Sequence, residues 1–179
     1  MSPQLWSAVR PLEQGSIASW MRHYHELLHD VCVAAQTRDA VAWAAIRQGY
    51  DIFRAEIVAI ALRSGDDYET IAFRRDGGAY PSLRFTVQND PDGPAYVPGQ
   101  IINIPDLPLF ARRFPAVRPI AEAGLKSMVA AAFSSHVHGD GYIAFCSRGD
   151  QEYSMDEYTL MCLHALAAGI GFDRVGLLV

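Results

Sequence analysis

Two apolar segments separated by a short polar turn, in the last third of the chain, constrain its fold most. The first runs from Gly124 to Phe133 and the second from Tyr142 to Ser147, with Gly139-Asp140-Gly141 between them. This order predicts a β-hairpin with the glycines in its turn. Because residues 128–133 are apolar at every position, the pattern does not indicate which face of this strand points into the core.

A helix with a clear start follows the hairpin. Ser154 can cap its first turn, and Glu157, three residues later, completes a capping box. Apolar side chains then recur at helical spacing, at Leu160, Leu163, Leu166, Ala167 and Ile170.

The upstream half predicts two helices and then further strands. Apolar residues recur at helical spacing over residues 19–48, and Asp39 is a candidate cap between the two helices. Residues 55–62 and 68–73 are apolar segments on either side of Ser64-Gly65-Asp66-Asp67, which favours a tight turn. Short strands are expected at 83–87 and 101–104, the latter followed by Asp106.

This order of elements resembles a GAF domain, a family of small-molecule-binding sensor domains. The resemblance implies an α+β fold in which an antiparallel β-sheet is flanked by N- and C-terminal helices. It covers residues 20–175, so we expect an N-terminal tail at 1–18 and a single domain at 19–179. A small-molecule-binding, regulatory role in signal transduction is the function that the resemblance implies.

Composition agrees with a globular domain. Half of the 179 residues are hydrophobic, which suits one mixed domain. A net charge of -5 with scattered basic residues argues against nucleic acid as a partner. No apolar run is long enough to cross a membrane, no signal-peptide pattern opens the chain, and three cysteines lie in apolar segments. We therefore expect a cytoplasmic protein with free thiols and without membrane attachment.

The resemblance also implies where a ligand binds, under the irregular segment 96–124. Prolines punctuate apolar residues there, which suits a pre-formed cover over an apolar pocket. Arg112, Arg113 and Arg118 supply cations for a carboxylate, so an anionic or aromatic carboxylate metabolite is the expected ligand class. The predicted pocket region contains Phe73, Ile104, Asp106, Phe110, Arg113, Phe114, Ser127, Val129 and Phe145.

Catalysis is not expected. The free methionine sulfoxide reductases of the GAF family need cysteines in the segment before the hairpin, and residues 76–126 contain none. The bilin-attaching cysteine and the Asn-Lys-x-Phe-Asp-Glu string of other family branches are also missing. The sequence identifies no cofactor.

Two histidine patterns support a metal-dependent alternative. His136 and His138, with Asp140 close behind, could form a facial ligand set for a non-haem iron, haem or zinc sensor or enzyme. His25-Glu26-Leu27-Leu28-His29 fits the helical H-E-x-x-H zinc pattern, although the short segment before it and Cys32 after it do not match the zinc hydrolases.

A receptor for acyl-homoserine lactones is a further alternative. The autoinducer-binding domains also carry an Ala-Gly-Leu before the hairpin, as Ala123-Gly124-Leu125 does here. Their Trp-x-x-Tyr pair followed by Asp is not found. The GAF resemblance also implies a homodimer through the first and last helices, where Trp20, Leu27, Val31, Leu160, Leu163, Leu166 and Ile170 are apolar.

Overall fold

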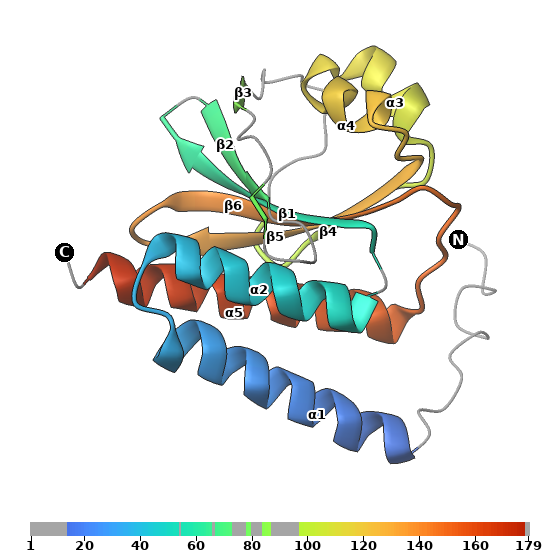
Figure 1. Ribbon diagram of the computed structural model, residues 1–179. Coiled ribbons are helices and arrows are strands. Elements are labelled where there is room, and N and C mark those ends of the chain that lie inside the picture. Colours follow the sequence, from blue (N-terminus) through green and yellow to red (C-terminus); the bar gives the residue numbers. More distant parts are fainter. Residues whose placement is uncertain are drawn as a thin grey trace.

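A six-stranded antiparallel sheet lies between two sets of helices (Figure 1). The computed structural model describes residues 14–53, 55–65, 67–72, 78–79, 84–86 and 97–177, without the side chains of 14–17, 84–86 and 116. The strand order is β3-β2-β1-β6-β5-β4. The strands are β1 (Ile57–Ser64), β2 (Asp67–Ala72), β3 (Arg84–Thr86), β4 (Ile101–Ile104), β5 (Ser127–Ser135) and β6 (Gly139–Ser147).

Both predicted hairpins are present. Strands β1 and β2 pair from Ser64 with Asp67, and Gly65 adopts a φ of 66° in the turn. Strands β5 and β6 pair as far as Ser135 with Gly139. Their turn is therefore residues 136–138, earlier in the chain than the predicted Gly-Asp-Gly turn. Gly139 and Asp140 extend β6 because they pair with the last residues of β5.

Three helices cover one face of the sheet: α1 (Gln14–His29), α2 (Arg38–Phe53) and α5 (Met155–Gly176). In Figure 1, α2 and α5 lie against the sheet and α1 packs below them. Apolar side chains of the sheet meet these helices in the main core, with Val58, Ile60, Ile143 and Phe145 each at most 1% exposed. Since α1 begins at Gln14, the expected boundary at residue 18 falls within this helix.

The junction of α1 and α2 differs from its prediction. A π-helical turn, Asp30–Ala34, continues α1. The side chain of Thr37 caps α2 by accepting a hydrogen bond from the Ala40 N–H at 3.2 Å, so Asp39 is not the cap. By contrast, α5 begins as predicted, because the Ser154 and Glu157 side chains each accept from the other's backbone N–H in a capping box.

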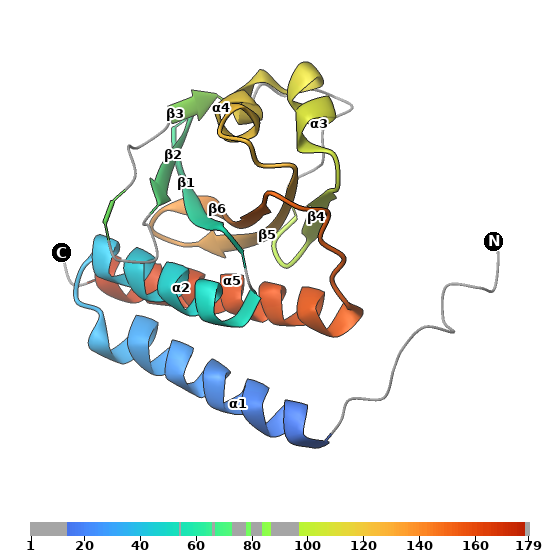
Figure 2. The same cartoon turned by 45° about the vertical axis from the view of Figure 1, so that its right-hand side comes forward.

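Two short helices, α3 (Leu107–Arg113) and α4 (Arg118–Glu122), lie on the opposite side of the sheet. Figure 2 shows them above the sheet, with the three long helices below it. Leu107 and Leu125 anchor this region in a second, smaller core cluster with Ile104, Met128 and Cys146. In the described part of the chain, no helix is long and apolar enough to span a bilayer.

Candidate functional site

Strand register places a row of alanines across the sheet face that carries α3 and α4. Directly paired residues of antiparallel strands share a face, and the pairs Ile102–Ala130, Ala130–Ala144, Ala144–Ala59 and Ala59–Ala72 connect five strands. A second row beside it joins Ala132, Tyr142, Ala61 and Thr70. We call the six alanines of these rows the alanine floor: Ala59, Ala61, Ala72, Ala130, Ala132 and Ala144.

The alanine floor is partly exposed in its middle and buried elsewhere, since Ala61, Ala130 and Ala132 are at most 9% exposed. Ala59, Ala72 and Ala144 are partly exposed although they lie on inner strands, β1, β2 and β6. Their chain neighbours Ile60 and Ile143, on the other face, are fully buried. A methyl side chain projects little above a sheet, so a floor of alanines leaves room that larger side chains fill on the helix-covered face.

Different side chains close the two ends of this face. At one end, the smaller core cluster seats α3 and α4 on β4 and β5. At the other end, the ring centroids of Tyr68 and Tyr142 lie 5.6 Å apart, and the Arg63 guanidinium forms an ion pair with the Asp140 carboxylate at 3.2 Å. Burial raises the pKa of Tyr68, so its hydroxyl stays protonated near neutral pH. The alanine floor therefore lies between an apolar end and an aromatic, polar end.

Thr70 adds a polar group to this face. The residue is 9% exposed, and its hydroxyl oxygen is buried without a hydrogen-bond partner in the described structure. Sequence reasoning missed both Thr70 and the alanine floor, because pairing register decides which residues are neighbours. The alternation Tyr68, Thr70, Ala72 along β2 was the available signal.

The predicted pocket residues around α3 are close to one another. Ile104 is buried in the smaller core cluster, and Asp106 caps α3 by accepting a hydrogen bond of 2.9 Å from the Leu109 N–H. Phe110 stacks on Phe114 at 4.3 Å between ring centroids, and the Arg113 guanidinium lies 5.5 Å from the Phe114 ring centroid. Arg112, Arg113 and Arg118 are exposed, the first two in the last turn of α3 and the third at the start of α4.

The other predicted pocket residues are separate from this group. Val129 and Phe145 belong to the main core on the face of α2 and α5, opposite Ile104. Ser127 is buried and donates a hydrogen bond of 2.8 Å to the Gly149 carbonyl, which ties β5 to the loop after β6. Phe73 lies outside the described residues. The predicted set thus divides between two faces, because an apolar strand does not indicate its orientation.

The predicted metal ligands of the hairpin do not converge. His136 is exposed, whereas the His138 ring lies edge-on to Phe172 at 5.8 Å between centroids. Asp140 is paired with Arg63. Over the residues that the structure describes, no group of three or more His, Cys, Asp or Glu side chains could hold a metal ion.

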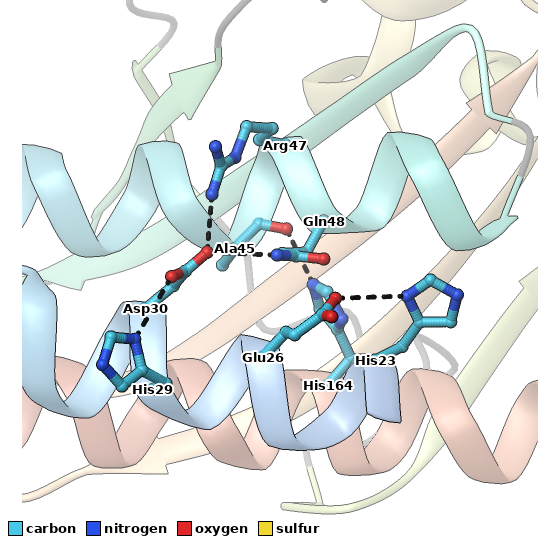
Figure 3. A network of polar contacts seen from close by, with 8 residues as sticks. All are labelled: His23, Glu26, His29, Asp30, Ala45, Arg47, Gln48 and His164. Carbon is cyan, nitrogen blue, oxygen red and sulfur yellow. Dashed lines mark hydrogen bonds and ion pairs between the residues drawn. The ribbon is translucent and has the colours of Figure 1, made fainter. Parts of the chain in front are cut away.

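Both H-E-x-x-H histidines lie on α1, and His29 belongs to a network of polar contacts that reaches α2 (Figure 3). His29 lies 3.6 Å from Asp30, whose carboxylate also accepts hydrogen bonds from Arg47 at 2.5 Å and Gln48 at 3.1 Å. Glu26 lies 3.8 Å from the Nδ1 atom of His23. The Asp30 contacts link the end of α1 to α2, whereas the His23–Glu26 contact is within α1, and both support a structural role for this segment.

The three cysteines are free thiols. Burial raises the pKa of Cys146 to about 12, and burial also raises the pKa values of Cys32 and Cys162. A thiol with a raised pKa carries little thiolate at neutral pH, and the thiolate is the nucleophile. The positions of these cysteines therefore offer no support for thiol catalysis.

Similarity to known proteins is visible in structure and not in sequence. No family model and no curated protein matches the chain. Its structure is similar to the chromophore-binding domain of an unusual bacteriophytochrome from R. palustris, with a TM-score of 0.67 and 13% identity over 95% of this chain. The chain spans 65% of the length of that domain.

Two smaller proteins match over almost their whole length. The GAF domain of a phosphoenolpyruvate-protein phosphotransferase from Coxiella burnetii has a TM-score of 0.63 and 13% identity, over 90% of this chain and 98% of that one. Free methionine-R-sulfoxide reductase from Neisseria meningitidis, in complex with its substrate, has a TM-score of 0.64 and 12% identity, over 96% of this chain and 99% of that one.

Proposed function

Because the chain has the fold of a GAF domain, we propose that it is a non-catalytic sensory domain of a signal-transduction system that binds a small molecule over the alanine floor. The observation that carries this proposal is the partial exposure of Ala59, Ala72 and Ala144 on inner strands. Binding sites are mostly apolar with a few polar groups, and this face combines alanines with the Thr70 hydroxyl.

The ligand class we propose is an aromatic carboxylate metabolite. The alanine floor suits the ring of such a ligand, since its rows contain no charged side chain. The carboxylate would then lie toward α3 and α4, which carry the positive charges of Arg112, Arg113 and Arg118. Phycocyanobilin-bound and phycoerythrobilin-bound GAF domains are among the similar structures, with TM-scores of 0.65, so this fold accommodates ring-containing ligands.

A ligand-capture experiment tests the site. Wild-type protein and the Ala59→Leu variant are incubated with a cell metabolite extract, desalted and examined by native mass spectrometry. We expect the wild type to retain a non-covalent organic mass that Ala59→Leu does not retain, because the larger side chain fills the floor. Ala18→Leu, at an exposed position of α1, is the matched control and should retain it.

Two results would count against the proposal. Equal retention by wild type and Ala59→Leu would place the ligand elsewhere. Turnover of the captured compound, lost in Ala59→Leu, would replace the sensory role with a catalytic one.

We also propose that residues 19–179 act as one cytoplasmic domain that forms a homodimer through α5. Leu166 and Ile170, one helical turn apart, are 40% and 53% exposed, whereas Leu27 and Val31 are buried within the chain. The apolar residues of α5 thus remain available to a second copy. Analytical ultracentrifugation should detect a dimer that Ile170→Glu converts to monomer, and a monomeric wild type would contradict it.

A further inference from the structure

The Thr70 side chain lies at one end of the second row of the sheet face. Thr70 pairs with Ala61, which pairs with Tyr142, and Ala72 follows two residues later on the same face of β2. Thr70 is therefore in line with the alanine floor and next to its partly exposed middle. Its hydroxyl is buried, and no described group forms a hydrogen bond with it.

A buried hydroxyl without a partner destabilises the free protein. Valine has nearly the same shape as threonine and would fill this position without an unpaired polar atom. A hydroxyl that is buried at the edge of a partly exposed apolar surface gains a partner when a ligand with a polar group lies on that surface. A ligand on the alanine floor would therefore supply the partner that the described residues do not.

The alanine floor also restricts the shape of the ligand. Ala130, Ala144, Ala59 and Ala72 lie on four adjacent strands, so their row extends about 14 Å at the usual strand spacing. The second row lies two residues along each strand, about 7 Å away. Tyr142 stands within the second row, so the low and flat part of this face is the first row of methyl groups. A flat ring system contacts more of such an area than a compact, rounded molecule does.

We propose that the Thr70 hydroxyl is the polar anchor of a flat, fused-ring ligand that lies across the alanine floor, in the site on which the proposed function rests. A hydroxyl donates one hydrogen bond and accepts others, so a ring carbonyl or a ring N–H is a suitable partner. The part of the ligand above the floor is uncharged, because the two rows contain no Asp, Glu, Lys, Arg or His. Thr70 thus selects for ligand orientation and the floor selects for ligand shape.

Two probes of equal charge and different shape test this inference. Anthraquinone-2-carboxylate is flat and carries ring carbonyls, whereas adamantane-1-carboxylate is compact. Each is titrated into nitrogen-15-labelled protein, and amide chemical shifts report both the affinity and the place of binding. We expect the flat probe to shift the amides of Ala59, Ala72 and Ala144 and to bind at least about tenfold more tightly than the compact probe.

Variants then separate the anchor from the floor. Thr70→Val removes the hydroxyl at constant side-chain shape and should lower the affinity for the flat probe by about five- to tenfold. Thr70→Ser keeps the hydroxyl and should keep most of the affinity. Ser19→Val, at an exposed position of α1, is the control and should not change the affinity. Ala59→Leu and Ala144→Leu should each abolish binding.

Each other result overturns the inference in a recognisable way. A flat ligand anchored by Thr70 is contradicted by any of three results: equal affinity for both probes, an unchanged affinity in Thr70→Val, or no binding of either probe. In these cases the ligand-capture experiment still tests whether the alanine floor is a binding site. Two results together contradict both this inference and the proposed function. These are amide chemical-shift changes confined to the groove of Ile101, Met155 and Tyr158, and an affinity of Ala59→Leu equal to that of the wild type.

Discussion

The Nε2 atom of His164 lies 2.7 Å from the carbonyl oxygen of Ala45, in the buried interface between α5 and α2 (Figure 3). A carbonyl oxygen can only accept, so Nε2 carries the proton and donates it. The Nδ1 atom is buried and has no partner in the described structure. Burial lowers the pKa of His164 to about 4, whereas the hydrogen bond to Ala45 acts in the opposite direction. The imidazole is therefore neutral in the folded protein near neutral pH.

We expect this histidine to make folding stability depend on pH. Below its ordinary pKa of about 6.5 the unfolded chain binds a proton at His164 and the folded chain does not, so the free energy of unfolding falls from about pH 6.5 down to about pH 4. The loss has an upper limit of roughly 3 kcal/mol. Urea unfolding of wild type and His164→Leu at several pH values measures it. A similar pH slope in both proteins would contradict the assignment.

Thr70→Val should stabilise the protein in the absence of ligand. The substitution replaces a buried hydroxyl that has no partner among the described residues by a methyl group of the same size, which should raise the free energy of unfolding by about 1 kcal/mol. Urea denaturation measures the change. The control is Thr159→Val, which removes an exposed hydroxyl that donates a hydrogen bond to the Met155 carbonyl and should not stabilise. A less stable Thr70→Val protein would show that the hydroxyl has a partner in the free protein.

Gly171→Ala should destabilise the packing of α5 against the π-helical turn Asp30–Ala34 and α2. An added Cβ would lie 2.9 Å from the Val31 carbonyl oxygen and 3.0 Å from a methyl carbon of Val41. The free-energy cost of such overpacking exceeds the gain in helix propensity from replacing glycine. We therefore expect the free energy of unfolding to fall by about 1–2 kcal/mol, as measured by thermal or urea unfolding. Gly149→Ala, where an added Cβ meets nothing within 4 Å, should cause no comparable loss. A neutral Gly171→Ala would mean that the helices separate easily.

Ser154→Ala should weaken the start of α5. The Ser154 hydroxyl accepts a hydrogen bond from the Glu157 N–H at 3.2 Å, and the Glu157 carboxylate accepts one from the Ser154 N–H at 2.7 Å. Loss of the hydroxyl should reduce the free energy of unfolding by about 1 kcal/mol. Ser19→Ala, at an exposed position within α1, is the matched control and should not reduce stability. Equal stability of both variants would contradict a capping role.

Local patterns predicted most of the elements and less of their packing. The turn at Gly65 and the capping box at Ser154 were recognisable because both depend on residues that are close in sequence. Glycine destabilises an isolated helix, so local propensity alone predicts that Gly171 weakens the last helix. The structure gives Gly171 a packing role, because it admits the carbonyl of Val31, a residue far away in the sequence.

The sequence by itself determined the α+β order of strands, turns and capped helices, since these follow from backbone propensities within a few residues. The tertiary structure decided which side of each strand meets the helices. Met128 and Val129 are adjacent and both apolar, yet Met128 faces α3 and Val129 faces the main core. When both faces of a strand are buried, hydrophobicity carries no period of two. Only pairing with neighbouring strands brings Ala59, Ala144 and Thr70 together, which is why the candidate site was not apparent in the sequence.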